Sequence, residues 1–592
     1  MVKTLGQLFI HTIKSFPKDD LMLYKEAGSY VPISTDEVAK RVKNICLGLR
    51  ALGLESGDKL IIFSDNRPEW VMTDMANQCL GGVTVPIYPT LVPDQVKYII
   101  NNSDAKIVCF SDEELWKKIK EVKNALPNVQ HYVTYASEAP EGASTLAEVM
   151  RKGEALDKQD SGLFEQIAMA GKPDDVASII YTSGTTGIPK GVMLTHQNFI
   201  SNIKSVSTVV EFSEKDTVLS FLPLAHVLER MVTFTYLYRG CSIAYAESIE
   251  TVGENLIEVK PHIMVSVPRV FEKIYAKVID NVLASSSLKR KIFFWAVKVG
   301  KEYGKRKLEK QPIPKSLERK RGIAEKLVFS KVIEKTGGRV RFFVSGGAPL
   351  SKDIADFFYA LGLVVLEGYG LTETSPVIAL NSFENLKFGT VGKPIPGVDV
   401  KIADDGEILS KGPHIMKGYY RMEEETQEAI KNGWFYTGDI GHIDAEGFLV
   451  ITDRKKDLIV TSGGKNVAPQ PIENLLKTNP YISNVVVIGD RRKFISALVI
   501  PNFEKIENYA KSKNIAYSSL GELIKNEKIV SFIEAEVNNM TNHLASYEKV
   551  KKVRLLEREF EIEQDEITPS LKVKRNVVGE KHKKIIDEMY SD

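Results

Sequence analysis

The sequence predicts an α/β protein with more than one domain, and two observations carry this prediction. First, apolar runs of strand type alternate with helical patterns over about the first 170 residues, as in layered α/β units with a largely parallel sheet. Second, 592 residues exceed what one ordinary hydrophobic core accommodates. The 43% hydrophobic and 26% charged content is that of a soluble globular protein.

The first expected elements follow one another in a regular order. An amphipathic helix is expected within residues 1–17, and a second one over 36–54, because apolar residues recur at helical spacing before Gly53. A strand, a helix and a strand then follow at residues 58–66, 69–83 and 84–88. This order is the beginning of a layered α/β domain.

The apolar runs, the N-terminal segment and the cysteines indicate in which compartment the protein resides. No run of 18 apolar residues occurs, and no small-residue cleavage site follows the N-terminal apolar patch, so we expect neither a transmembrane helix nor a signal peptide. The four cysteines form no CxxC pair, which favours buried, reduced thiols in a cytoplasmic protein. The thiols are Cys46, Cys79, Cys109 and Cys241.

The stretch YTSGTTGIPKG (residues 181–191) is too poor in apolar side chains to serve a core. It joins one apolar run, VASII, to another, VMLT, so we expect a loop between two strands, followed by a helix with Thr195 at its N-cap. A Walker A loop opens directly into a helix and has Ser or Thr after its lysine. Gly191 follows Lys190 here, which disfavours a P-loop NTPase.

The residue types in this loop are nevertheless those of an anion cradle. Glycines let backbone N–H groups converge on phosphate oxygens, hydroxyls add donors, and a lysine adds positive charge. The alternative is a polar surface turn. The candidate phosphate-binding residues are Thr182, Ser183, Gly184, Thr185, Thr186, Gly187 and Lys190.

A second candidate site lies in a predicted β-hairpin. Strands are expected at 441–444 and 449–452, and pairing Asp444 with Leu449 would place Asp439 opposite Arg454. A carboxylate there can accept two hydrogen bonds from a ribose diol, and the guanidinium can reach the same sugar. A purely structural ion pair is the alternative.

These segments, with three others in the same order, resemble the adenylate-forming (AMP-binding) enzymes, which include acyl-CoA synthetases, luciferases and peptide-synthetase adenylation domains. The resemblance covers nearly the whole chain. The segments that carry it are YTSGTTGIPKGVMLTH, SGGAPL, EGYGLTET, WFYTGDIG, DRKKDLIVTSGGKNVAP and PSLKVKR.

The resemblance implies a division of the chain and several residue roles. Residues 1–453 would be a large multi-subdomain part that binds ATP and the fatty acid, and residues 454–592 a small mobile α+β lid that swings about Lys456. Lys572 would catalyse adenylation. Lys574 is the runner-up, because Leu571 replaces the glycine that usually precedes the lysine. Gly464 would let the pantetheine arm of coenzyme A pass.

The same resemblance suggests how ATP is held. Glu373 and Thr182 would bind a Mg²⁺ ion that bridges the phosphates, since Mg²⁺ prefers oxygen ligands, and Tyr369 would lie against adenine. For Glu373 a position at a helix N-terminus is the alternative, and for Tyr369 plain packing. The remaining nucleotide-contact candidates are Gly347, Ala348, Glu367, Gly368, Gly370 and Thr372.

His226 would lie beside the acyl carboxylate and phosphate in such an enzyme, although a lone histidine among apolar residues is more often a core residue. Arg230 would share its helix face. Some relatives have a bulky aromatic residue there, proposed to gate the acyl tunnel. The arginine departs from that pattern and leaves the gating mechanism open.

A basic segment bears on the substrate and on the partners. Residues 289–341 contain 18 Lys or Arg and 5 Glu, and such an insertion (about 280–340) resembles those of the long-chain fatty acyl-CoA synthetases. Its FFWAV run suggests peripheral binding to the anionic inner face of a membrane, whereas a solvated helical hairpin is the alternative. No stacking motif accompanies the charge, so we expect no nucleic-acid partner. A homodimer stays open.

We therefore expect a long-chain fatty acid–CoA ligase that uses ATP, Mg²⁺ and coenzyme A. One alternative is a ligase for medium-chain or aromatic acids, or one that acylates a carrier protein. The alternative outside enzymes is a membrane- or lipid-binding scaffold, against which the intact set Lys190, Glu373, Asp439, Arg454 and Lys572 argues.

Overall fold

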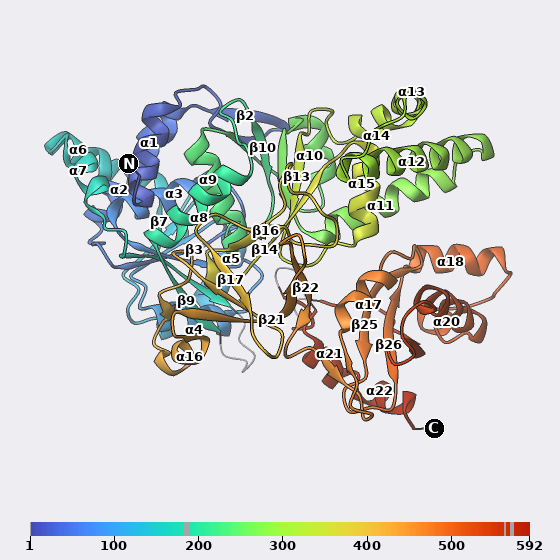
Figure 1. The fold of residues 1–592 in the computed structure, drawn as a ribbon. Coiled ribbons are helices and arrows are strands. Elements are labelled where there is room, and N and C mark those ends of the chain that lie inside the picture. The colour runs from blue at the N-terminus through green and yellow to red at the C-terminus, as the bar shows by residue number, and fades with distance from the viewer. Residues whose placement is uncertain (1, 183–188, 562–563, 569–572, 592) are drawn as a thin grey trace.

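The computed structural model describes residues 2–182, 189–561, 564–568 and 573–591. Three sheets build the N-terminal part, and a smaller C-terminal part with its own sheet follows at the lower right of Figure 1. The predicted α/β class is confirmed. The helices of the first 260 residues are α1 (Leu5–Ser15), α2 (Thr35–Ala51), α3 (Pro68–Leu80), α4 (Pro93–Ser103), α5 (Glu113–Val122), α6 (Leu146–Gln159), α7 (Leu163–Ala170), α8 (His196–Val209), α9 (Val227–Arg239) and α10 (Val252–Val259).

Local sequence explains the ends of these helices. In α2 the Ser34 side chain accepts a hydrogen bond from the Glu37 backbone N–H, and two acidic residues occupy the first turn, where they favour the positive end of the helix dipole. The chain then leaves the helix at Gly53, whose φ of +87° is a left-handed conformation that glycine adopts without strain. The helix predicted over 36–54 is thus confirmed.

The first large sheet has eight strands, and its central strands are parallel while one edge is antiparallel. In spatial order they are β19 (Gly418–Tyr419), β9 (Lys190–Thr195), β8 (Val176–Thr182), β4 (Val83–Ile87), β3 (Lys59–Phe63), β5 (Ile107–Phe110), β6 (His131–Thr134) and β7 (Ser144–Thr145). The residues of β4 are all buried, as expected of a strand covered on both faces.

The second large sheet has nine strands, also with a parallel centre. Its order is β16 (Lys393–Pro394), β15 (Val377–Leu380), β14 (Val365–Gly370), β13 (Phe342–Ser345), β12 (Ile263–Ser266), β10 (Thr217–Ser220), β11 (Ser242–Tyr245), β1 (Met22–Glu26) and β2 (Ser29–Ile33). One continuous hydrophobic core joins residues of both large sheets and the helices between them.

A third sheet contains the predicted hairpin. Its strands are β17 (Asp399–Ile402), β18 (Glu407–Lys411), β20 (Ile430–Lys431), β21 (Trp434–Ile443) and β22 (Leu449–Arg454). The predicted pairing of Asp444 with Leu449 is wrong, because Ile443 pairs with Leu449. A β-bulge beside Ile440 then shifts the register by one residue, so the predicted position of Asp439 opposite Arg454 is nevertheless confirmed.

The basic segment forms helices that project at the upper right of Figure 1. They are α12 (Ser287–Leu308), α13 (Lys315–Ala324), a π-helical turn at Glu325–Phe329 and α14 (Ser330–Glu334), which follow α11 (Pro268–Leu283) in the chain and lie near α15 (Lys352–Leu361). Phe293 and Ala296 of the FFWAV run are buried, whereas Phe294 is 48% exposed. Most of the run thus packs onto the protein, and Phe294 faces outward.

The C-terminal part has a separate hydrophobic core around a three-stranded sheet. Its elements are β23 (Ile459–Val460), β24 (Asn466–Val467), α17 (Pro469–Leu476), β25 (Ile482–Ile488), β26 (Ile495–Pro501), α18 (Phe503–Ser512), α19 (Leu520–Leu523), α20 (Glu527–Thr541), β27 (Val550–Leu555), α21 (Arg575–Lys581) and α22 (Lys583–Met589).

The remaining expectations about cysteines and membrane spans can also be compared with the structure. All four cysteines are free and buried, as predicted. Within the described ranges, no helix is both long and apolar enough to cross a membrane.

Candidate active site

The glycine- and threonine-rich stretch joins two antiparallel strands, as predicted. Thr182, the last residue of β8, pairs with Lys190, the first residue of β9, so both lie where the connecting loop begins and ends. Thr195 caps α8 through a hydrogen bond that its hydroxyl accepts from the Asn198 backbone N–H at 3.2 Å, which confirms the predicted N-cap. The candidates Ser183, Gly184, Thr185, Thr186 and Gly187 lie outside the described residues.

Three predicted site residues meet around one carboxylate. The hydroxyl of Tyr369 donates to Oδ2 of Asp439 at 2.6 Å, and Nε of Arg454 lies 3.0 Å from Oδ1. Burial lowers the pKa of Arg454, but Asp439 and its neighbours outweigh this effect and raise it overall. Asp439 is therefore a fixed carboxylate between a phenol and a guanidinium, and ribose hydroxyls can bind to such a group.

Glu373 and Lys190 are connected through a tyrosine that the sequence did not single out. Oη of Tyr419 donates to Oε1 of Glu373 at 2.8 Å, and Nζ of Lys190 lies 5.0 Å from the centre of the same ring. Tyr419 belongs to the short edge strand β19, which pairs with β9. A tyrosine 46 residues from Glu373 in the sequence gives no local signal of this contact.

The strands β13 and β14 are parallel, so both end at the same edge of the nine-stranded sheet. The loop that follows β13 begins at this edge. Gly347 in this loop has a φ of +82°, and Ala348 is exposed. Glu367 is buried, and one of its oxygens accepts from the Leu350 N–H at 3.4 Å. Burial raises the pKa of Glu367 to about 8. Its described contact is thus with the backbone of the loop.

The other candidates in EGYGLTET differ in their surroundings. A Cβ atom on Gly370 would lie 1.7 Å from the carbonyl oxygen of Pro376, so only glycine fits where the chain turns back into β15. On Gly368 it would lie 3.1 Å from a methyl of Leu380. Thr372 is half-buried and begins a 3₁₀ turn, Thr372–Thr374, that contains Glu373. Glu373 therefore does not stand at the N-terminus of an α-helix.

His226 is the N-cap of α9, and its Nδ1 accepts a hydrogen bond from the Leu228 N–H at 3.1 Å. The ring is half-buried. This hydrogen bond fixes the start of the helix at the end of the loop that follows β10. Arg230 lies on α9, so the segment is helical, as the expected proximity of Arg230 to His226 requires.

The structure answers the question that Arg230 raised. Its side chain is fully buried, with Nε 2.8 Å and Nη2 2.7 Å from the two carboxylate oxygens of Asp74. A third hydrogen bond joins Nη1 to the Ser178 hydroxyl in β8, and Cζ lies 5.6 Å from the ring centre of Phe199 and 5.4 Å from that of Phe234. A guanidinium held in this way cannot act as a swinging gate.

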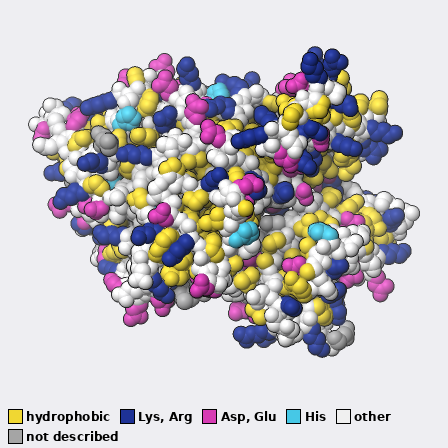
Figure 2. All heavy atoms as spheres, viewed as in Figure 1, with side chains coloured by type: hydrophobic (Ala, Val, Ile, Leu, Met, Phe, Trp, Pro, Cys, Tyr) yellow, Lys and Arg dark blue, Asp and Glu magenta, His cyan; other side chains and the backbone are white. Residues whose placement is uncertain are grey.

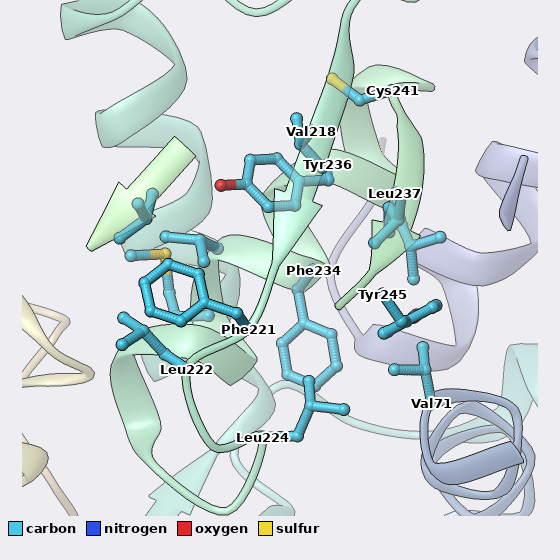
Figure 3. Close-up of a cluster of buried hydrophobic side chains, with 14 of the residues drawn as sticks. Val71, Val218, Phe221, Leu222, Leu224, Phe234, Tyr236, Leu237, Cys241 and Tyr245 are labelled. Atoms are coloured by element: carbon cyan, nitrogen blue, oxygen red, sulfur yellow. The ribbon is translucent and has the colours of Figure 1, made fainter. Parts of the chain in front are cut away.

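A dense apolar region surrounds the start of α9. Phe221, Leu222 and Leu224 precede the helix, and Phe234 and Tyr236 lie on it, so that their side chains converge in one cluster (Figure 3). The helix therefore connects a histidine at its polar end with an apolar interior behind it.

The C-terminal candidates lie on two separate elements. Gly464 has a φ of +71° in the turn between β23 and β24, and an added Cβ would meet nothing within 4 Å. Lys574 is engaged by Asp565, while Lys572 lies outside the described residues. Lys456 lies two residues after Arg454, and burial together with the Arg454 guanidinium lowers the pKa of Lys456.

The residues present fit a magnesium ion bound mainly by nucleotide phosphates. Among the described residues no group of three or more His, Cys, Asp and Glu side chains is arranged to hold a metal. Mg²⁺ in nucleotide sites commonly has only one or two carboxylate ligands besides phosphates and water. Glu373, half-buried and directed by Tyr419, is a donor of this kind.

The chain matches known protein families along most of its length. Residues 9–420 match the family model described as AMP-binding enzyme, and residues 456–592 match the AMP-binding enzyme C-terminal domain. A long-chain-fatty-acid–CoA ligase, FadD15 of Mycobacterium bovis, is 37% identical over 579 residues, covering 97% of this chain and 95% of the relative. The peroxisomal long chain acyl-CoA synthetase 7 of Arabidopsis thaliana is 32% identical, covering 100% and 87%.

Among solved structures, the anthranilate CoA ligase AuaEII in complex with anthranoyl-AMP is similar with a TM-score of 0.74, covering 99% of this chain and 98% of that one. At 17% sequence identity, this likeness concerns the fold alone.

Proposed function

This chain belongs to the AMP-binding enzyme family, and we propose that it ligates long-chain fatty acids to coenzyme A through an acyl-adenylate. One observation carries the proposal. The chain is 37% identical, along 97% of its length, to a protein named as a long-chain-fatty-acid–CoA ligase. The cluster of Tyr369, Asp439 and Arg454 supports it, because its polar groups suit a ribose.

In the first half-reaction, a carboxylate oxygen of the fatty acid attacks the α-phosphorus of ATP. The bond from that phosphorus to the bridging oxygen breaks, and pyrophosphate leaves. Lys190 and the loop after Thr182 would hold the phosphates. Mg²⁺, bound by Glu373 and Thr182, would neutralise phosphate charge. Lys572 would stabilise the charge that gathers between carboxylate and phosphate.

In the second half-reaction, the thiol sulfur of coenzyme A loses its proton and attacks the acyl carbonyl, and AMP leaves. Lys572 has to withdraw so that the pantetheine arm can enter. We place the domain boundary between residues 453 and 454 and the pivot at Lys456. Rotation about it would replace Lys572 by the turn that contains Gly464, where a residue without a side chain leaves room for the arm.

The proposal is tested by thioester formation with ATP and coenzyme A across acids of increasing chain length. We expect turnover to be highest with acids of roughly twelve carbons or more, with AMP and pyrophosphate released in equal amounts. Better turnover of acetate or benzoate would show that the substrate class is wrong. Complete loss of pyrophosphate release with every acid would favour the scaffold alternative.

We propose further that the enzyme is cytoplasmic and binds the inner face of an anionic membrane through the helices of the basic segment. Lysine and arginine side chains gather over this region at the upper right of Figure 2. Leu288 and Phe294 on α12 and Ile323 on α13 are each about half exposed or more. Exposed apolar side chains among basic ones suit the headgroup region of a bilayer.

Vesicle sedimentation tests the membrane proposal with matched variants. Arg290→Ser with Lys291→Ser removes two exposed charges from α12, and Lys511→Ser with Lys513→Ser removes two exposed charges from the C-terminal domain. Each basic residue near an anionic surface contributes about 1 kcal/mol, so we expect roughly 30-fold weaker binding for the first pair. Equal binding of both double variants, or equal binding to neutral vesicles, would contradict the proposal.

A further inference from the structure

The short segment of residues 416–420 contacts two elements that carry candidate ligands of the phosphates and the metal. They are β9, which begins with Lys190, and the 3₁₀ turn that contains Glu373. The backbone of the segment bonds to β9 on one side, with the Lys417 N–H donating to Met193 and the Tyr420 N–H to Gly191. On the other side the Met416 N–H donates to the carbonyl oxygen of Glu373 at 2.8 Å. The segment thus ties the eight-stranded sheet to a turn of the nine-stranded sheet.

The side chain of Tyr419 contacts both the carboxylate of Glu373 and the ammonium group of Lys190. Its hydroxyl donates to Glu373 at 2.8 Å, and its ring faces the Lys190 ammonium at 5.0 Å. The Tyr419 N–H in turn donates to the Thr426 hydroxyl at 2.9 Å, in the middle of α16 (Glu423–Ala429). The tyrosine is therefore held from three directions.

This arrangement holds both charged groups without pairing them. If Lys190 and Glu373 formed a direct ion pair, each would already be neutralised by the other, and phosphate and metal would have to break that pair. A phenol donates to a carboxylate and presents its negative ring face to a cation. Each charged group consequently keeps its charge for the ligand.

We propose that Tyr419 is a positioning residue that orients Glu373 for the metal and Lys190 for the phosphates of ATP. This inference rests on the proposed function, which assigns those two residues to the phosphates. Tyr419 acts through its neighbours and takes no part in bond making.

The test compares three variants. Tyr419→Phe removes only the hydroxyl, and Tyr419→Leu removes the ring as well. Tyr420→Phe is the matched control, because the ring of Tyr420 lies near Lys59 and Arg421 instead. Binding of a non-hydrolysable ATP analogue is measured by calorimetry at increasing Mg²⁺ concentrations, and thermal unfolding verifies that each variant is folded.

For Tyr419→Phe we expect the Mg²⁺ concentration at half-maximal nucleotide binding to rise about tenfold, since the lost hydrogen bond is to a charged group. Binding without Mg²⁺ should stay within about twofold of the wild type. Tyr419→Leu should also weaken binding without Mg²⁺, because Lys190 loses the ring. Thioester formation from a supplied acyl-adenylate should be unchanged in Tyr419→Phe, since this step involves neither ATP nor the release of pyrophosphate.

A Mg²⁺ midpoint for Tyr419→Phe equal to that of Tyr420→Phe would overturn the inference. So would an equal loss of both half-reactions, which indicates a merely structural role. If Tyr419→Leu does not fold, Tyr419→Phe decides alone. Failure of the wild type to bind the analogue or to activate any long-chain acid would instead overturn the proposed function, and the inference with it.

Discussion

Two regions of the molecule contain ion pairs that differ in their exposure to solvent. Within the N-terminal part, Arg230 and Asp74 form a bidentate ion pair in which neither side chain is more than 1% exposed. Between that part and the C-terminal domain, Lys505 contacts Asp280 at 2.5 Å, with exposed fractions of 25% and 32%. Removing one member of a buried pair is costly, whereas a solvent-exposed pair contributes little.

The position of each contact explains the difference. Arg230 joins α9, whose N-cap is His226, to Ser178 on β8, which leads into the candidate phosphate-binding loop. The second region contains Lys505 and Arg269, and the latter donates to the Ser483 carbonyl at 2.8 Å. A buried ion pair thus fixes the elements next to the candidate nucleotide site. The C-terminal domain, in contrast, contacts α11 through partly exposed polar groups that can bind water instead.

The largest expected effect is on the buried pair. Arg230→Leu leaves Asp74 as an uncompensated buried charge, and we expect a loss of about 3–5 kcal/mol in the free energy of unfolding. Urea unfolding measures it. Arg41→Leu is the control, because Arg41 pairs with Glu37 at a surface site where both are more than 30% exposed, and should lose less than about 1 kcal/mol. Similar losses in both variants would remove the distinction between the two regions.

A buried carboxyl next to this pair predicts a pH dependence. Burial raises the pKa of Glu229 to about 8, whereas its ordinary value is 4.5. The folded protein therefore keeps a proton that the unfolded chain releases, so this group lowers stability progressively as pH rises from about 4.5 to 8. Glu229→Gln should flatten the fall of the melting temperature over that window. An unchanged slope would show that Glu229 is not protonated in the folded protein.

These two predictions concern residues whose surroundings the sequence did not reveal. The sequence places Arg230 on the same face as His226 only if the segment is helical, and its partner lies 156 residues away, a contact that no local pattern reports. The hairpin behaved differently. Its strands are adjacent in the sequence, so Asp439 was placed opposite Arg454 correctly even though a bulge made the pairing at the turn wrong. Local patterns predict secondary-structure elements and the pairing of strands that are adjacent in the sequence. The contact partners of Tyr419 and Arg230 depend instead on packing between distant segments.

The smallest expected effect is on the contact between the two parts. Lys505→Ala should change the free energy of unfolding by less than about 1 kcal/mol, because the pair is partly exposed. It should nevertheless speed trypsin cleavage after Lys456 several-fold, since the C-terminal domain detaches from α11 more often. Lys511→Ala, an exposed lysine on the same helix α18, is the control. Equal cleavage rates in the two variants would argue against docking through Lys505.

The most direct test of the whole account is to measure the two half-reactions separately in Lys572→Ala, with Lys574→Ala as the control. Lys574 is engaged by Asp565 within the C-terminal domain, so its loss should leave adenylation nearly intact. For Lys572→Ala we expect pyrophosphate release to fall by two or more orders of magnitude, as when one stabilising group is removed from a transition state, while a supplied acyl-adenylate still reacts with coenzyme A at the wild-type rate. Equal loss of both half-reactions in a folded Lys572→Ala protein, or loss of adenylation in Lys574→Ala alone, would contradict the account.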